Sequence, residues 1–215
     1  MKSPRCMIVS LIIMLALNCA TTTLGTAMNP DMKHVKLRKI MVVAPFADLL
    51  LRRETERRFP KNLKVYRSTS GYYNRLPKDC FLQSLDIIPP YKEYTVEELN
   101  AKLWDNSIDG ILVVALEDYW TSQTYMPRAS KTEGEIRTYG NSLFYESYTQ
   151  ESGGFYVSKP SVKFDIRLFD VTSGEIIWMA TSVTSGNAFA NYGTLMESLS
   201  MSVIKELTKE DIITK

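Results

Sequence analysis

Runs of apolar residues, and stretches in which apolar and polar residues alternate, divide this chain into expected strands and helices. Residues 39–44 are mostly apolar and end at Pro45, which predicts a buried strand. Asp48 is placed to cap a helix that continues to about Arg58. Residues 111–116 are continuously apolar, as is typical of a central strand covered on both faces of its sheet.

Between these two strands, the sequence indicates secondary structure less clearly. Residues 64–68 fit a short edge strand in a turn-rich region, and residues 85–88, which precede two prolines, fit a strand that the prolines stop. Thr95 and Glu98 form a capping box ahead of apolar residues at helical spacing. A second helix is therefore expected from there to about Asn106.

The C-terminal third predicts a hairpin followed by a helix. Residues 162–168 alternate apolar and charged side chains, the two-residue period of a half-buried strand. Residues 170–174 supply the turn, and residues 175–183 supply the partner strand, with Trp178 assigned to the core. A second capping box begins at Thr194. One apolar stripe then follows the last helix: Leu195, Leu199, Val203 and Leu207.

These elements predict an α/β (α+β) fold, with a mixed three- to five-stranded sheet, helices packed on it, and a C-terminal hairpin plus helix. The chain has 215 residues and a mass of 24.5 kDa, enough for one domain with a proper core. We expect that single domain over residues 38–215, with an aromatic-rich insertion at residues 119–158.

The N-terminal residues 1–18 have the composition of a secretory signal peptide. A short basic start precedes an apolar run from Met7 to Leu17, whereas a membrane-spanning helix needs roughly 20 apolar residues. The residues that end at Cys19 resemble a bacterial lipobox, in which the cysteine becomes acylated. The alternative is ordinary cleavage after Ala27, which follows other small residues.

The residues after Cys19 and the three cysteines indicate how the N-terminal part of the mature chain is organised. Residues 19–37 are predicted to be the lipidated cysteine and a flexible tether, because they are small and polar without a clear period. Cys6 leaves with the signal peptide, so Cys80 has no partner for a disulfide if Cys19 carries lipid. Cys80 is interpreted as a bystander or a half-buried small residue, since the single histidine, His34, lies far away in the sequence.

The charge balance gives no indication of a nucleic-acid partner. The formal net charge is +2, and both Lys2 and Arg5 lie in the signal peptide, so the mature domain is neutral. We therefore expect no nucleic acid among the partners of this chain.

The insertion at residues 119–158 is the best candidate for a binding surface, because it combines Tyr and Trp with Ser, Gly and Asn. Three interpretations remain open: an extended hairpin whose aromatic residues cover the sheet, a docking surface for a protein or glycan, and a hairpin inserted in a membrane. The candidate surface residues are Trp120, Tyr125, Tyr139, Phe144, Tyr145, Tyr148 and Tyr156.

The sequence lacks the residue clusters on which most catalytic and cofactor sites depend. One histidine and one free cysteine do not build the common zinc sites, and the glycine-rich phosphate-binding motifs are missing. Glu117 and Asp118 are adjacent in an expected strand, so their side chains point to opposite faces. We therefore expect no catalytic residue, no metal site and no cofactor besides the covalent lipid, with a carboxylate-based hydrolase as a minor alternative.

Several segments together resemble a group of uncharacterised bacterial lipoproteins. These segments are the leader that ends at Cys19, the strand at 39–44, the Arg-rich helix after Asp48, residues 87–90, 95–99 and 108–114, the Tyr- and Gly-rich middle, and residues 169–178. The chain is more distantly similar to the small α/β domains of lipoprotein activators of peptidoglycan synthases and of the curli-secretion lipoprotein.

The resemblance implies a protein of the bacterial cell envelope, anchored by its lipid to the outer membrane and facing the periplasm. It implies interaction work and supplies no active-site residue. The expected function is thus a non-catalytic protein-interaction module, whose partners are the membrane and an envelope protein or glycan. The alternatives are an oligomeric subunit of an envelope secretion or assembly complex and, with less support, an envelope hydrolase.

Overall fold

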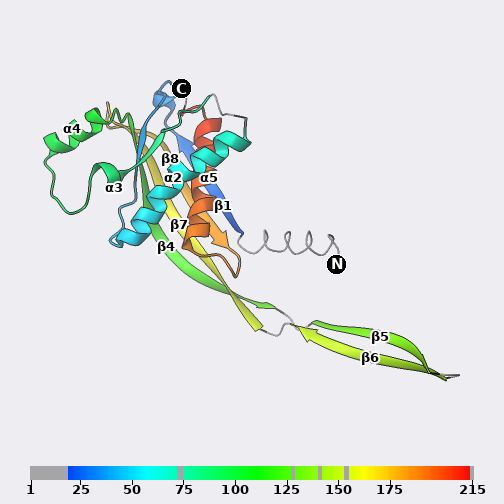
Figure 1. The fold of residues 1–215 in the computed structure, drawn as a ribbon. Helices are drawn as coiled ribbons and strands as arrows, with labels where there is room; N and C mark the ends of the chain where they lie inside the picture. The colour runs from blue at the N-terminus through cyan, green and yellow to red at the C-terminus, as the bar shows by residue number, and fades with distance from the viewer. Residues whose placement is uncertain (1–18, 72–74, 127–128, 140–141, 153–154, 214–215) are drawn as a thin grey trace, which may run out of the picture.

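A computed structural model describes residues 19–71, 75–126, 129–139, 142–152 and 155–213, with the backbone alone for residues 126–155. Within this part of the chain, one mixed sheet has the strand order β1-β8-β7-β4-β2-β3 (Figure 1). Its strands are β1 (Ala20–Met28), β2 (Ile40–Val43), β3 (Phe81–Gln83), β4 (Gly110–Met126), β7 (Phe155–Asp170) and β8 (Ile176–Gly186). β2 runs parallel to β3 and β4, and the other neighbours are antiparallel.

Helices pack on this sheet, so the predicted α/β class is confirmed. The described helices are the 3-10 helix η1 (Pro30–Met32) and the α-helices α2 (Leu49–Thr69), α3 (Ser84–Ile87), α4 (Val96–Asp105) and α5 (Tyr192–Lys209). The long helices α2 and α5 pack against each other and against the same face of the sheet. The main core lies between them and the sheet, and its largest buried side chain is Trp178, as predicted.

A smaller cluster on the other face of the sheet holds α3 and α4. Met41 of β2 packs there with Ile87, Leu103 and Ile108. This cover is confined to the end of the sheet where α4 lies. Along β4, Leu112 and Val114 are fully buried in the main core, whereas Val113 and Ala115, which point to the other face, are only partly buried. The prediction that the central strand is covered on both faces is therefore wrong beyond Ile111, the β4 residue of this face that packs against the smaller cluster.

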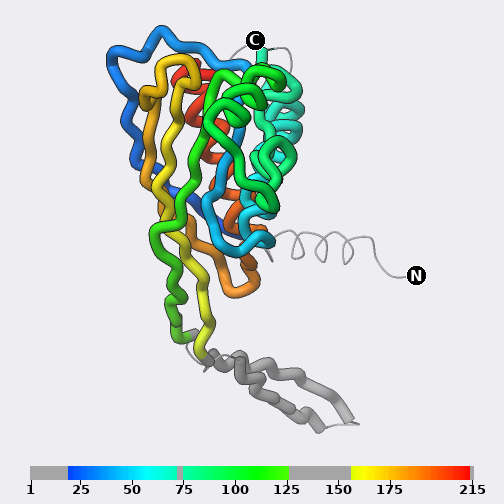
Figure 2. The backbone as a smooth tube through the Cα atoms, turned by 90° about the vertical axis from the view of Figure 1, so that its left-hand side faces the viewer, coloured from blue at the N-terminus to red at the C-terminus, as the bar shows by residue number. Residues whose placement is uncertain are grey.

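β4 and β7 continue past the end of β8 as a two-stranded ribbon (Figures 1 and 2). We call its residues 121–126 and 155–160 the β4–β7 arm. β8 pairs with β7 only as far as Ser161, whereas β4 and β7 remain paired to Met126 and Phe155. Strands β5 (Ala129–Tyr139) and β6 (Ser142–Ser152) follow and pair antiparallel in a separate two-stranded sheet. The insertion is thus built of paired strands.

The predicted flexible tether is wrong, because its residues 20–28 form strand β1. β1 pairs along its whole length with β8, from Ala20 opposite Gly186 to Met28 opposite Trp178. Leu24 packs against the core from this strand. The sequence shows no alternation of apolar and polar residues in β1, because threonine and alanine occupy most of its inward and most of its outward positions. The remaining signal was the preference of threonine for strands. With β1 the sheet has six strands, one more than the predicted upper limit.

The segment after Arg58 is also helical, contrary to the predicted edge strand at residues 64–68. α2 continues through Pro60 to Thr69. A proline inside a helix costs about 3 kcal/mol, and burial of the large side chains of Phe59 and Leu63 offsets that cost. The strand expected at residues 85–88 is likewise helix α3, and the strand β3 ends before it.

The helix starts are set by side-chain caps. The carboxylate of Asp48 accepts from the N–H groups of Leu50 and Leu51, and the predicted Thr95 capping box is present at α4. At α5 the cap is Asn191 instead of Thr194, because the Asn191 side chain accepts from the Thr194 N–H at 3.0 Å. α5 therefore begins three residues earlier than predicted.

Candidate functional site

Cys19 lies exposed at the start of the described chain, directly ahead of β1. Its backbone carbonyl accepts a hydrogen bond of 2.9 Å from the N–H of Asn187, which follows β8. The β-sheet hydrogen bonding therefore extends to Cys19 itself, and no linker separates this residue from the folded domain.

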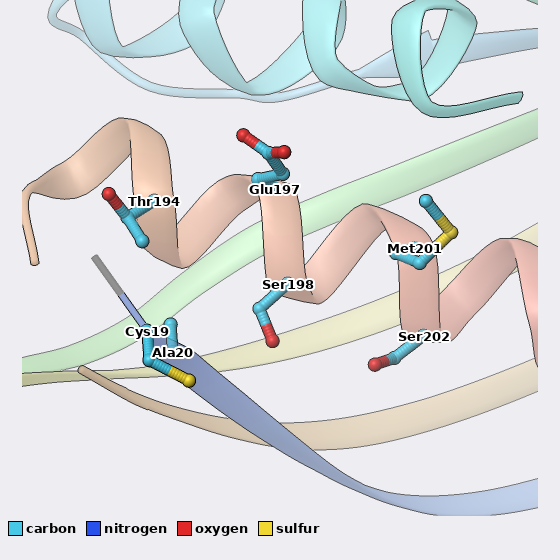
Figure 3. A pocket seen from close by; sticks show the side chains of 7 residues that line it. All are labelled: Cys19, Ala20, Thr194, Glu197, Ser198, Met201 and Ser202. Carbon is cyan, nitrogen blue, oxygen red and sulfur yellow. The ribbon is translucent and has the colours of Figure 1, made fainter. Parts of the chain in front are cut away.

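An open pocket of about 560 Å³ lies between the start of β1 and the first turns of α5. Figure 3 shows the side chains that line it: Cys19, Ala20, Thr194, Glu197, Ser198, Met201 and Ser202. Nearby, the Thr22 hydroxyl is 2.8 Å from the Ser198 hydroxyl and 2.9 Å from that of Thr184. These contacts tie β1 to α5 as well as to β8.

Three of the predicted surface residues are exposed at the base and along the β4–β7 arm. Trp120 is 37% exposed, Tyr125 50% and Tyr156 68%. Tyr125 and Tyr156 pair in the register of β4 and β7, and their ring centroids lie 5.2 Å apart. Directly opposed residues share one face of a ribbon, so these two rings form an exposed aromatic pair.

The other four predicted surface residues lie in the outer hairpin. Tyr139 belongs to β5, and Phe144, Tyr145 and Tyr148 belong to β6. Their side chains lie outside the described residues.

A second exposed aromatic site was missed in the sequence. Trp104 of α4 is 81% exposed and borders a pocket of about 470 Å³, which we call the α4 pocket. Its lining residues are Asn100, Leu103, Trp104, Ser107, Ile108, Asp109, Val171 and Thr172. The sequence did contain a signal for this site. Trp104 lies one position outside the apolar stripe of its helix, where a large aromatic side chain is not buried in the core.

Cys80 and His34, which the sequence offered as a thiol and a possible base, lie in different surroundings. Cys80 is buried, and its burial, followed by the charges of Asp109 and Asp79, raises the pKa of its thiol to about 12. The thiol therefore stays protonated at neutral pH. His34 is exposed on the segment after η1.

The two adjacent carboxylates on β4 take separate structural roles. Glu117 forms an ion pair of 2.7 Å with Lys163, and Asp118 accepts a hydrogen bond from the Tyr119 N–H. A register shift between Leu116 and Asp118 places Glu117 in a bulge. In the described chain, no group of three or more His, Cys, Asp and Glu side chains is arranged to hold a metal ion.

The described helices include none with the length and apolar character needed to cross a membrane.

Comparisons with known proteins returned no matching family model and no matching curated protein. Among solved structures, the PelC dodecamer from Paraburkholderia phytofirmans matches with 14% identity and a TM-score of 0.46, covering 87% of this chain and 97% of that one. A dodecamer of a PelC variant matches with a TM-score of 0.43 and the same identity and coverage. A PDZ domain protein from Parabacteroides distasonis matches with 12% identity and a TM-score of 0.30, covering 90% of this chain and 38% of that one. TM-scores this low do not establish a shared fold.

Proposed function

We propose that this chain is a lipid-anchored protein of the bacterial cell envelope that works by binding a partner and performs no chemistry itself. The observation that carries the proposal is the position of Cys19, exposed and directly ahead of a strand that the sheet requires. An acyl group on this cysteine would hold the domain against a membrane without a spacer.

The pairing of β1 bears on the two cleavage sites left open by the sequence. Cleavage after Ala27 would remove all of β1 except Met28. β8 would then lose the strand that pairs with its outer edge, and the domain would lose Leu24 and the Thr22 contacts. Cleavage before Cys19 keeps the complete sheet. The fold thus favours the lipidated form over the soluble alternative.

The α4 pocket is the surface that we assign to a protein partner. Trp104 is among the residue types that contribute most to protein interfaces, and its exposed ring stands beside the apolar side chains of Leu103 and Ile108. The pocket lies at the start of β4, whereas Cys19 lies at the opposite end of the sheet. An anchored chain would therefore present this pocket away from the membrane.

The anchor is tested by the mass of the mature N-terminal peptide, isolated from membranes of the native host. We expect a peptide that begins at Cys19 and carries a diacylglyceryl group. The variant Cys19→Ser is expected to leave the membrane fraction. A free terminus at Met28 would contradict the proposal.

The partner surface is tested by a photo-crosslinking residue at position 104, compared with one at Lys205 on the exposed side of α5. We expect a discrete crosslinked envelope protein from position 104 and none from position 205. The same crosslinks from both positions, or from neither, would exclude the α4 pocket as the binding surface.

The edge of the sheet supports the oligomeric alternative. β1 is the outermost strand in the described sheet, and its nine residues contain no charged side chain and no proline. Such an edge lacks the features that usually block pairing with another strand. A discrete large oligomer of the acylated protein in detergent would favour an assembly subunit, whereas a monomer would favour the single adaptor.

A further inference from the structure

We propose that the β4–β7 arm contacts the surface of the bilayer that holds the Cys19 lipid, with Tyr125 and Tyr156 lying in the headgroup region. This inference rests on the proposed function, because it takes the membrane to be at Cys19. It assigns to the arm a partner different from that of the α4 pocket.

The first step is the level of Cys19 relative to the arm. The register across the sheet is given by three pairs: Ala20 with Gly186, Ser185 with Ser161, and Ser161 with Trp120. Cys19 precedes Ala20, so it lies level with the point where β4 and β7 leave the body of the sheet. Figures 1 and 2 show the arm departing at the same end of the sheet as the start of β1.

The second step is the reach of the arm beyond that level. Residue pairs from Ser122–Lys159 to Met126–Phe155 extend past the last pair that β8 supports. At about 3.3 Å per residue, five such pairs span roughly 17 Å. The headgroup region on one side of a bilayer is about 6 Å thick, so an arm inclined to the membrane plane can keep its tyrosine pair, the fourth of the five pairs, within it. An inclined arm that starts at the level of the anchored residue therefore meets the membrane surface.

The third step is the chemistry of the arm. Residues 121–126 contain no charged side chain, and Lys159 is the single charged residue in 155–160. Tyr125 and Tyr156 combine an apolar ring with a polar hydroxyl, as do the aromatic residues that concentrate at membrane interfaces. One cation beside two tyrosines suits a surface that contains anionic lipids.

The exposure of the tyrosine pair supports a contact outside the domain. Tyr125 and Tyr156 pack on each other and remain 50% and 68% exposed. A ribbon of two strands has no core to cover these rings. Contact with a bilayer surface would cover them without any change in the sheet.

The experiment is a comparison of two fluorescent labels on the acylated protein in vesicles of phosphatidylethanolamine and phosphatidylglycerol. One variant carries Tyr125→Cys and the matched control carries Trp104→Cys, each labelled with an environment-sensitive dye. Background labelling is minimal because Cys80 is fully buried with its thiol pKa near 12, and Cys19 carries the lipid. Trp104 lies at the far end of the sheet, so its label reports the water-exposed state.

We expect the label at position 125 to shift its emission to the blue and to be quenched by nitroxides attached to lipid headgroups. Iodide in the water should quench it about 10-fold less than the label at position 104. Equal iodide quenching at both positions, in protein that still floats with the vesicles, would overturn the inference and leave the anchor intact. Protein that carries no lipid and does not float would instead refute the proposed function.

A third result separates a membrane from a protein partner. Protection of position 125 in native membranes, together with full exposure in the pure lipid vesicles, would mean that another protein covers the arm. That result would also overturn the inference.

Discussion

The Ser84 hydroxyl donates a hydrogen bond of 2.6 Å to the Oε1 of Glu56, a side chain that is fully buried. The same oxygen accepts from Arg52 Nε at 3.0 Å and from the Ala44 N–H at 3.2 Å. Oε2 accepts from the Leu85 N–H at 3.0 Å. One carboxylate thus holds together the chain after β2, the first turns of α2 and the start of α3.

Replacing Glu56 should destabilise the domain strongly, because removal of the carboxylate leaves several buried donors without an acceptor. We expect Glu56→Ala to lower the free energy of unfolding by about 3 kcal/mol, and Glu56→Gln to lower it less. Urea denaturation measures this loss. The control is Glu206→Ala, whose ion pair with the largely exposed Lys209 is screened by water and should contribute little to stability. Equal losses for Glu56→Ala and the control would contradict the prediction.

The hydroxyl of Tyr192 joins the two long helices near their N-terminal ends. It lies 2.7 Å from the hydroxyl of Thr55 on α2. Tyr192→Phe keeps the ring and removes this bond, so we expect a loss of about 1 kcal/mol in the free energy of unfolding. Tyr91→Phe, at a side chain that is 86% exposed, should change stability very little. Thermal unfolding of the two variants provides the comparison.

Two glycines that lie in neighbouring strands should differ sharply in their tolerance of a methyl group. A Cβ at Gly186 would collide with the Cβ of Ala190 and lie 3.2 Å from a Leu195 methyl carbon. At Gly25 the nearest atom, a backbone oxygen of Thr181, is 4.0 Å away. We expect Gly186→Ala to cost about 2 kcal/mol and Gly25→Ala to be nearly neutral. Chemical denaturation of both variants tests this difference.

The stability of the domain should fall in alkaline solution because of Cys80. Burial, with smaller contributions from Asp109 and Asp79, raises the pKa of this thiol to about 12, whereas a thiol in an unfolded chain ionises near pH 8.5. Between those values the unfolded chain loses a proton that the folded chain keeps. The stabilising contribution is therefore complete below about pH 8.5 and is lost as the pH rises toward 12.

This effect is measured as the free energy of unfolding at about pH 8 and about pH 10.5. We expect the decline between these conditions to be smaller for Cys80→Ala by about 2 kcal/mol. Some decline should remain, because burial also raises the pKa of Tyr192 to about 12. An unchanged decline in the variant would show that Cys80 does not titrate as described.

Elements with a strong local period were predictable from the sequence. The alternation in β7 placed Phe164 and Ile166 in the core, and the stripe on α5 placed Leu199 and Val203 there. At these positions the periodic apolar pattern marks the same residues that the tertiary structure buries. The local preference and the tertiary contacts therefore favour the same conformation. The Thr95 capping box succeeded for the same reason, because its two hydrogen bonds are made within one turn of helix.

The errors arise where tertiary contacts decide the structure. The first helix was predicted to end at about Arg58, yet it continues through Pro60, and Leu63 beyond the proline is buried. β1 has weak hydrophobic contrast, and its conformation depends on pairing with β8, which lies far along the chain. For the candidate site, the sequence located Cys19 and the exposed rings of Tyr125 and Tyr156, but not the α4 pocket. That pocket forms only when Val171, after β7, meets α4.

The short connection between Cys19 and β1 restricts how two anchored copies can meet. Antiparallel pairing of β1 with its own copy requires a two-fold axis perpendicular to the strands, which places the two Cys19 residues at opposite ends of the paired region. Over the length of β1 that separation is about 27 Å. Copies held in one leaflet, with their sheets rising from it, cannot reach this arrangement. In that geometry the anchor would itself keep an uncharged sheet edge from pairing antiparallel with its own copy.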